Sequence, residues 1–336
     1  MTSPTIYDVA RAAGVATSTV SRAFSNPQRV SAATRDLVLR TAGELGYEPN
    51  PHARALTSRR TQTLAMVVSD ITNPHFYEII RGAELRAKAS ARTLVLVNAE
   101  ESPRIEREQI GRLSRSVDGF LLTASRLPEE DLLEIAAGQA VVMVNRQVAG
   151  IPSVVLDQRE GCRQLVTHLA SLGHRSVAYL SGPRKSWMAT ARWTAIRDAA
   201  AEVGVSAVRM GPFTPRVEHG AAAADAALTT GATALIAHND LLAIGVLLRL
   251  ADRSVRVPED ISVIGFDDIF SAALCTPSLT TLGGAHVDVG RAAVELLLEA
   301  ADAPRRAGAA AAQLVLPSQV FLRNSTGPVP ERRAAR

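Results

Sequence analysis

Cysteine, aromatic side chains and long apolar runs are all scarce in this chain of 336 residues. Its two cysteines, Cys162 and Cys275, lie far apart in apolar stretches, so we expect buried thiols in a reducing cytoplasm and neither a disulfide nor a metal site. No run of about 18 apolar residues occurs, which argues against a membrane-spanning helix. The N-terminal MTSPTIYDVARAAGV has no basic segment followed by an apolar run, so we expect no signal peptide and a cytoplasmic protein.

Motifs of catalysis are also missing. The sequence contains no phosphate-binding GxxxxGKS or GxxxxGKT loop, no GxGxxG after a strand, no GxSxG and no paired Cys or His at metal-ligand spacing. Asp267 and Asp268 are adjacent, and successive side chains on a strand point to opposite faces, so they would make a poor acid and nucleophile pair for glycoside hydrolysis. We therefore expect no catalytic residue, no cofactor and no metal.

Charge is unevenly distributed along the chain. Residues 1–60 contain eight arginines and four acidic residues, out of totals of 37 basic and 33 acidic, so the rest of the chain balances at 29 of each sign. An excess of positive charge confined to one segment indicates a nucleic-acid-binding head on a neutral body. A charge bias that only improves solubility would give the same count, so charge alone leaves both interpretations open.

The first sixth of the chain has the pattern of three short helices. Val9 and Ala13 fall on one helical face, and Gly14 then interrupts the pattern with the residue that adopts positive φ angles most easily. A second helix begins near Thr17, and a third follows Ser31, its predicted N-cap. Helix, tight turn and helix are typical of a helix-turn-helix, whose second helix lies in the major groove of DNA. A small helical trio can equally be a protein-docking module.

Polar side chains on the outward face of the second helix are the candidate DNA contacts. Thr17 and Ser18 can meet base edges, and Arg22 is the strongest candidate because its guanidinium can donate to both acceptors of a guanine. Thr19, Ser21 and Asn26 are assigned to phosphates. The predicted DNA-binding set of the head is completed by Thr5, Tyr7, Ser31 and Thr34.

A resemblance to a known family carries this further. The elements YDVA, AGV, TVSR, VSAATR, LGY-x-PN and ARALTS occur in unbroken register over about 57 residues. This segment resembles the DNA-binding head of the lactose/galactose repressor (LacI/GalR) family of bacterial transcription regulators. One departure is Ala16, where the family usually carries Ser or Thr as the cap of the recognition helix.

The resemblance also gives a meaning to NPHARALTSRR, where a leucine lies in a basic segment. In this family the corresponding hinge forms a short helix on the operator, pairs with its dimer mate and inserts leucine into the minor groove. The matching residues here are Ala53 and Leu56, with Arg54 set for phosphates. An apolar wedge between base steps kinks the duplex, and the cost of unstacking is offset by new contacts. The alternative is a linker whose leucine packs weakly on the next domain.

From Leu64 onward, apolar runs alternate with amphipathic stretches. Strand patterns are LAMVVSD, TLVLVNAE, VDGFLLTA, AVVMVN, SVVLD, SVAYLSG, ALIAHND and ISVIGFDD. Repeated strand, helix and strand units predict parallel sheets covered on both faces, and about eight strands are too many for one small sheet. We therefore predict two lobes. The body resembles the effector-binding core of the same family and is similar in fold to periplasmic sugar-binding proteins.

The predicted fold class is α/β, with an N-terminal three-helix helix-turn-helix head and hinge helix, then a two-lobed parallel α/β core like that of periplasmic binding proteins. The predicted domains are the head (1–49), the hinge helix and linker (50–61), the effector-binding and dimerisation core (62–325) and a disordered tail (326–336). Within the core, lobe 1 is expected at about 62–158 plus 284–310, and lobe 2 at about 159–283 plus 311–325.

Polar residues at the carboxyl ends of the predicted strands indicate a ligand site, since loops converge there in α/β sheets. Amides and carboxylates from several strand ends, an arginine fork and an aromatic wall suit a polyhydroxylated ligand. Individually, such carboxylates can instead cap or turn the chain, and the aromatics can belong to the core. By position in the family, the expected effector-binding residues are His75, Phe76, Asn145, Trp187, Arg192, Asn239 and Asp267.

The sequence therefore predicts a homodimeric transcription regulator, most simply a repressor, that binds a palindromic operator under the control of a small-molecule effector, with a sugar preferred. A phosphosugar or a nucleobase-type effector is the first alternative, supported by His75, Lys185 and Arg184 near the expected mouth. A sugar-binding protein without a DNA role is the second. The sequence after Arg323 has no heptads, so we expect dimers and no tetramerisation helix.

Overall fold

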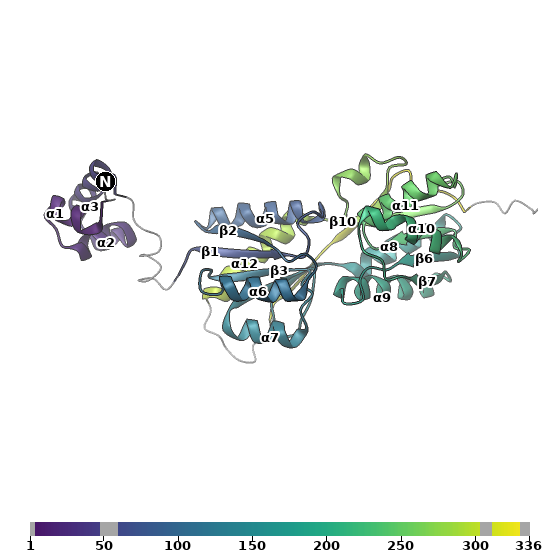
Figure 1. Ribbon diagram of the computed structural model, residues 1–336, viewed down its shortest axis with the longest axis horizontal. Helices are drawn as coiled ribbons and strands as arrows, with labels where there is room; N and C mark the ends of the chain where they lie inside the picture. Colours follow the sequence, from purple (N-terminus) through teal and green to yellow (C-terminus); the bar gives the residue numbers. More distant parts are fainter. Residues whose placement is uncertain (1–3, 48–59, 303–310, 330–336) are drawn as a thin grey trace, which may run out of the picture. The chain divides into compact units, whose positions relative to one another are not determined.

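The computed structural model describes residues 4–47, 60–302 and 311–329. The chain divides into two compact units, Met1–Gln62 and Thr63–Arg336, and each is described by itself (Figure 1). The predicted hinge helix, with Ala53, Arg54 and Leu56, lies outside the described residues. Within the described residues, no helix is both long enough and apolar enough to span a membrane.

The first unit is a three-helix head. Its elements are α1 (Ile6–Ala13), α2 (Thr17–Ser25), the 3-10 helix η1 (Pro27–Arg29) and α3 (Ala32–Leu45). Val9, Val20 and Val38, one from each α-helix, are completely buried against one another. Gly14, at a φ of 64°, makes the turn that separates α1 from α2. The helix-turn-helix therefore forms as its apolar spacing predicts, and α2 begins at Thr17 after Ala16, which supplies no side-chain cap.

The first lobe of the second unit is a six-stranded, all-parallel sheet with the strand order β11-β5-β4-β3-β1-β2. Its strands are β1 (Thr63–Val68), β2 (Thr93–Asn98), β3 (Gly119–Thr123), β4 (Ala140–Val144), β5 (Ser153–Leu156) and β11 (Gln313–Leu316). Its helices are α5 (His75–Ala89), α6 (Pro103–Leu113), α7 (Glu129–Gly138) and α12 (His286–Asp302).

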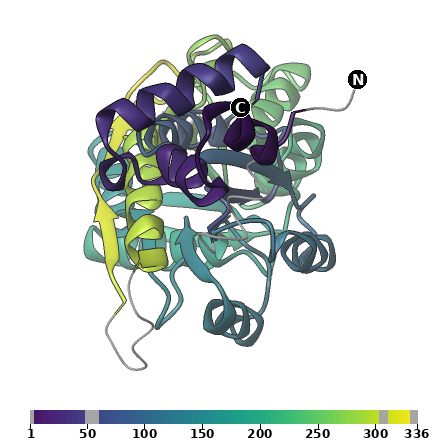
Figure 2. The same cartoon turned by 90° about the vertical axis from the view of Figure 1, so that its left-hand side faces the viewer.

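The alternation of side chains along β1 explains why both faces of this sheet are covered. Leu64, Met66 and Val68 pack in a cluster with α5 and α12, whereas Ala65 and Val67 pack with α6 and α7 on the opposite face. Figure 2 shows α12, in yellow-green, and α6 and α7, in blue to teal, on different sides of the first lobe. The continuous apolar run of β1 is therefore required by burial on two sides.

The second lobe repeats this architecture with the strand order β12-β10-β9-β8-β6-β7. All neighbours are parallel except β12, which is antiparallel to β10. Its strands are β6 (Ser176–Leu180), β7 (Ser206–Met210), β8 (Ala234–Ala237), β9 (Ser262–Phe266), β10 (Thr280–Gly284) and β12 (Ser318–Phe321). Its helices are α8 (Gln158–Ser171), α9 (Trp187–Glu202), α10 (Gly220–Leu228) and α11 (Asp240–Asp252), with the 3-10 helices η2 (Val217–His219) and η3 (Phe270–Ala273).

The chain crosses between the lobes after β5, after β10 and between β11 and β12 (Figure 1). The expectation that all of 311–325 belongs to lobe 2 is wrong, because β11 pairs in parallel with β5 of the first sheet. The expected disorder from residue 326 onward is also wrong for 326–329. The Val329 amide donates to the Leu172 carbonyl at 2.8 Å, and His174 Nε2 lies 3.1 Å from the Gly327 carbonyl oxygen.

Two glycines allow α5 and α12 to pack backbone against backbone. A Cβ on Gly290 would lie 2.0 Å from the Ile79 carbonyl oxygen, and a Cβ on Gly82 would lie 1.9 Å from that of Val287. Neither obstacle is a flexible side-chain tip, so the helices would have to separate to admit a methyl group.

Gly290→Ala is expected to lower the free energy of unfolding by about 1–3 kcal/mol, because a methyl group must displace the α5 backbone. Urea unfolding of the full chain, followed by circular dichroism, measures the change. Gly111→Ala is the matched control, since Gly111 lies in α6 with no atom within 4 Å of the added Cβ. It should be neutral or stabilising by about 0.5–1 kcal/mol. Equal effects of the two substitutions would contradict the close-packing argument.

Candidate functional site

A cleft at the carboxyl ends of both sheets brings together most of the predicted effector residues. Six of the seven line one pocket: His75, Phe76, Asn145, Arg192, Asn239 and Asp267. Trp187 does not, because it lines a neighbouring groove with Asp198 and Val315, which shares only Leu156 and Gln158 with the cleft. Its neighbours Ser186 and Met188 line the cleft instead, since adjacent positions at the start of α9 face different directions.

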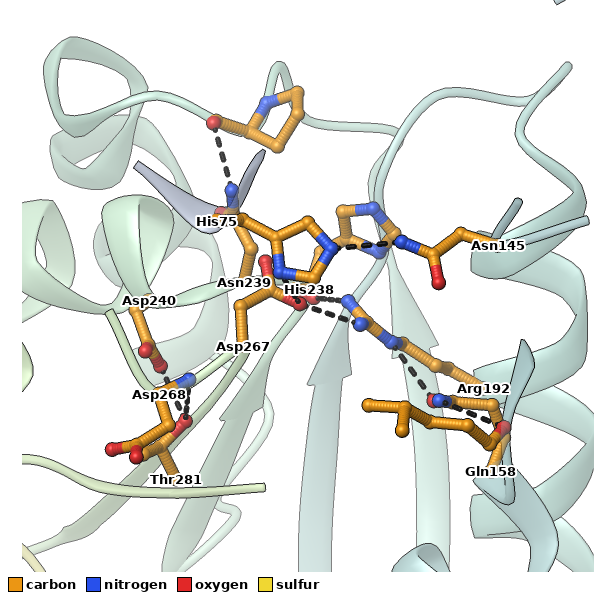
Figure 3. Close-up of polar contacts among 12 residues, drawn as sticks. His75, Asn145, Gln158, Arg192, His238, Asn239, Asp240, Asp267, Asp268 and Thr281 are labelled. Atoms are coloured by element: carbon orange, nitrogen blue, oxygen red, sulfur yellow. Dashed lines mark hydrogen bonds and ion pairs between the residues drawn. The ribbon is translucent and has the colours of Figure 1, made fainter. Parts of the chain in front are cut away.

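The Asp267 carboxylate is the electrostatic centre of the cleft (Figure 3). It follows β9 and accepts a hydrogen bond of 2.7 Å from Arg192 Nη2. Arg192, on α9, also donates to the His238 carbonyl and, at 3.2 Å, to Gln158 Oε1. Its guanidinium lies 4.2 Å from the centre of the Phe266 ring. Because both charged side chains are less than 8% exposed, this is a buried ion pair with its geometry fixed by several partners.

Two histidines from the first lobe face the same aspartate. His75, at the start of α5, has Nδ1 3.6 Å from Asp267 Oδ1, and its Nε2 lies 2.9 Å from the Asn145 amide nitrogen. With the amide donating to Nε2, the neutral ring carries its proton on Nδ1. His286, at the start of α12, donates from Nε2 to the Asp267 carbonyl at 2.8 Å. The two Nδ1 atoms are buried without a hydrogen-bond partner among the described residues.

Burial and charge set the protonation states in this cluster. Burial lowers the pKa of His75 to about 4, against the opposing influence of the Asp267 carboxylate. Burial would raise the pKa of Asp267, but His75 and the Arg192 guanidinium together lower it to about 2. Near neutral pH the cleft therefore contains an ionised carboxylate, a paired guanidinium and a neutral His75 ring that can donate a hydrogen bond.

Unusual backbone conformations orient two of these side chains. Asn145, directly after β4, has a φ of 57°, and Asp267, directly after β9, has a φ of 102°. Such values cost roughly 1–3 kcal/mol for a residue other than glycine and persist only where surrounding contacts hold them. The hydrogen bond from Asn145 to His75 and the ion pair from Arg192 to Asp267 are contacts of that kind.

Not every predicted residue has a free polar group to offer. Asn239 caps α11 by accepting from the Leu242 amide at 3.0 Å, and its amide nitrogen donates to the Pro215 carbonyl at 3.1 Å. The adjacent Asp240 is fully buried and accepts from Thr281 Oγ1 at 2.6 Å. Asn239 is therefore a cap as well as a lining residue, and Asp240 is structural.

Sequence reasoning missed several polar residues of the cleft, among them Gln158, His238 and His286. His238 is at the end of β8, one position before the predicted Asn239, so strand-end logic could have found it. Gln158 and His286 begin α8 and α12, at the points where the chain changes lobe. The sequence could have indicated these two residues only if the positions at which the chain crosses between the lobes had been known.

Among the described residues, no group of three or more His, Cys, Asp and Glu side chains is arranged for a metal ion.

An ion pair joins the two lobes beside the cleft, whose lining includes the neighbouring Ser69 and Pro215. Arg216, ahead of η2, donates from Nη2 to Asp70 Oδ2 at 2.7 Å, and the Thr72 amide and hydroxyl donate to the other oxygen of Asp70. Arg216 is half exposed, so this pair contributes modestly to stability.

In the head, α2 presents a polar face. Ser18, Ser21 and Arg22 are exposed, while Val20 and Ala23 are buried. Two other predicted DNA contacts have their hydroxyls in caps: Thr5 Oγ1 donates to Asp8 at 2.6 Å, and Ser31 Oγ accepts from the Thr34 amide at 3.3 Å. The remaining predicted contacts are Thr17 and Thr19 on α2, Asn26 after it, Thr34 on α3, whose hydroxyl lies 2.8 Å from Ser31 Oγ, and Tyr7 on α1, which is 67% exposed.

Comparison with known proteins decides the family. The chain matches "Bacterial regulatory proteins, lacI family" over residues 5–50 and "Periplasmic binding protein-like domain" over residues 166–326. The HTH-type transcriptional regulator DegA of Bacillus subtilis (strain 168) is 33% identical over 97% of this chain and 98% of its own length. The chain belongs to the LacI family.

Solved structures of LacI-family proteins share the whole architecture. The lac repressor dimer bound to operator and the anti-inducer ONPF has a TM-score of 0.84 and 25% identity, covering 97% of this chain and 100% of that one. A complex of the transcriptional regulator CelR with cellobiose has a TM-score of 0.69 and 30% identity, covering 96% and 99%. These relatives confirm the predicted fold class, and they make this LacI-family chain a transcriptional regulator and not an enzyme.

The buried His75 ring predicts a loss of stability in mild acid. Its pKa of about 4 in the folded state lies below the ordinary value of about 6.5, so below pH 6.5 only the unfolded chain takes up this proton. Between pH 6.5 and 4 the free energy of unfolding should fall by about 2–3 kcal/mol for this residue. Urea unfolding across that range measures it.

His75→Gln should flatten this pH dependence, because it removes one buried imidazole. His219→Gln is the control, since His219 is exposed on η2 and should leave the slope as in the wild type. A slope unchanged by His75→Gln would show that His75 is not held neutral by burial.

Proposed function

We propose that this LacI-family regulator is a repressor that acts in the cytoplasm as a homodimer, binds a near-palindromic operator and responds to a sugar in the cleft. The observation that supports this most directly is the cleft itself. It combines an ionised carboxylate, a guanidinium and two unpartnered histidine nitrogens within one buried site. Ligand binding alone accounts for the polar groups of the cleft, so no catalytic arrangement is needed to explain them.

The chemistry of the lining favours a polyhydroxylated ligand. When both rings are neutral, His75 Nδ1 is a donor that lies 3.6 Å from Asp267 Oδ1, beyond hydrogen-bond distance, and His286 Nδ1 is an acceptor; both are buried without a hydrogen-bond partner among the described residues. A buried polar atom without a hydrogen bond costs about 1–3 kcal/mol, so a ligand hydroxyl that serves it gains affinity. A hydroxyl both donates and accepts, which suits this mixed set. The cellobiose complex of CelR supports the same ligand class.

The proposed DNA contact rests on the exposed polar face of α2. Arg22 there can donate twice to a guanine, and Ser18 can meet a neighbouring base edge. A dimer would present two such helices to half-sites about one helical turn apart. The operator-bound dimer of the lac repressor supports this arrangement. The leucine wedge at Leu56, with Ala53 and Arg54, remains part of the proposal on the resemblance alone.

Effector binding would act by changing the separation of the lobes. Asp267 belongs to the second sheet and His75 to the first lobe, so a ligand that bridges them stabilises one closure state over the other. A ligand shifts such an equilibrium only by its difference in affinity for the two states, and coupling free energies are typically about 1–3 kcal/mol.

Arg22→Gln should weaken binding to operator sites, selected from random DNA, by about tenfold or more, corresponding to 1–3 kcal/mol of lost base recognition. It should also reduce the preference for operator over random DNA, as measured by fluorescence anisotropy. Arg40→Gln removes the same charge from an exposed site on α3 and should leave that preference unchanged. Equal loss of preference in both variants would mean that Arg22 contributes only charge.

Asn145→Gly should weaken sugar binding by about tenfold or more while leaving operator affinity intact. The substitution removes the amide, and glycine tolerates the φ of 57°. Sugar binding is measured as the increase in the melting temperature of the full chain with increasing concentrations of pentoses, hexoses and disaccharides. Gln147→Gly is the matched control, because this nearby amide lines the separate groove with Trp187. If no sugar raises the melting temperature of the wild type, the proposed effector class is wrong.

A further inference from the structure

A second pocket, which we call the basic pocket, adjoins the effector cleft at the carboxyl edge of the first sheet. Its charged lining comes from Arg104 and Arg107 on α6, Arg126 after β3, Arg146 after β4 and Lys185 of the second lobe, with one carboxylate, Asp131 on α7. Five cations against one carboxylate are an unusual lining for a pocket without an anionic ligand, since like charges repel.

Arg146 is the strongest indication of a ligand. It is 7% exposed, and its Nη1 donates to the Ser125 and Leu127 carbonyls at 2.9 and 2.6 Å. Its buried Nε has no hydrogen-bond partner, and no carboxylate lies within 4.0 Å of its side chain among the described residues. Burial lowers the pKa of Arg146, although the Glu129 and Glu106 carboxylates oppose that shift. A buried guanidinium of this kind is stabilised by an anion.

The other cations of the basic pocket differ in whether they already pair with a carboxylate. Arg107 pairs with Asp131, and Arg126 Nε donates to Glu101 at 2.5 Å. Lys185 is exposed and has no ion pair within 4.0 Å among the described residues. Arg104 pairs with Glu108, so Lys185 and Arg146 are the two cations of this lining with no carboxylate within 4.0 Å among the described residues.

Two helices begin at the same pocket, and their first turns also carry the carboxylates Glu106, Glu129, Glu130 and Asp131. Pro103 is the first residue of α6, and Pro128 precedes the first residue of α7, and both line the basic pocket. The unsatisfied amides and the dipole of a helix N-terminus favour phosphate and other anions. The buried Nε of Arg146, which has no hydrogen-bond partner, and the two helix starts are independent observations, and both indicate the same chemistry.

We propose that the basic pocket is a phosphate subsite of the effector site and that the effector is a phosphorylated sugar. Arg126 lines both the basic pocket and the effector cleft, so a phosphate bound beside Lys185 and Arg146 would be continuous with hydroxyls bound beside Asn145. This inference rests on the proposed function, because it refines the ligand class of the same cleft. The pocket recognises the phosphate group itself, whether it is free or attached to a sugar.

Lys185→Gln in the full chain tests the subsite, with Lys88→Gln as the matched control. Both lysines are exposed, and Lys88 lies on α5, outside the lining of either pocket. Isothermal titration with inorganic phosphate should show binding that Lys185→Gln weakens by about tenfold and Lys88→Gln leaves unchanged, as expected for loss of a charge-assisted contact. Hexose 6-phosphates and pentose 5-phosphates should bind more tightly than their parent sugars, and Lys185→Gln should remove most of that difference.

Three results would overturn the inference. The first is no phosphate binding at millimolar concentrations, or equal phosphate binding by Lys185→Gln and the wild type. The second is that phosphosugars bind no more tightly than their parent sugars, which would mean that the phosphate subsite does not contribute to effector binding. The third is a phosphosugar advantage that survives Lys185→Gln. In each case, sugar binding that is lost in Asn145→Gly would leave the proposed function standing, so the two failures are distinguishable.

Discussion

Asp267 is a carboxylate buried between two lobes, and the organisation of the core depends on compensating its charge. An ionised group removed from water costs several kcal/mol unless other groups replace the lost hydration. Arg192 supplies the counter-charge from its own lobe, and His75 and His286 approach from the other. The first residues of α5 and α12, the second turn of α9 with Arg192, and the end of β9 must therefore converge on one point. The effector cleft is this point of convergence.

The two units of the chain solve different recognition problems. The head uses a minimal core, with three completely buried valines, to hold one polar helical face. The second unit uses two sheets covered on both faces, so its strand ends are rigid and its polar loops can be precise. Neutral polar groups and the ion pairs Arg192–Asp267 and Arg126–Glu101 line the effector cleft, whereas cations dominate the adjoining basic pocket. Arg126 lies at the boundary, where both kinds of chemistry can be used by one ligand.

The local sequence pattern predicted the strands that are buried on both faces of a sheet and the helices whose apolar residues follow a clear helical period. It failed for β7, β10, β11 and β12. The sequence SAVRM of β7 is half polar at an exposed edge, TTLGG of β10 contains two glycines, and β11 and β12 are short strands at sheet edges. The family resemblance supplied six cleft residues that pattern alone could not rank. It also supplied Trp187, which lies in another groove, because position in a motif does not determine the direction of a side chain at a helix start.

By itself, the sequence determined the helix-turn-helix head, the two-lobed parallel core and the regulator family, because apolar periodicity and motif spacing are local properties of the chain. Only the tertiary structure decided which strand-end residues meet. It brought His286 and Gln158 into the cleft, committed Asn239 to a cap, moved β11 into the first sheet and left the Arg146 Nε without a partner. These outcomes depend on three crossings between lobes and on contacts between residues far apart in the chain, which no local pattern encodes.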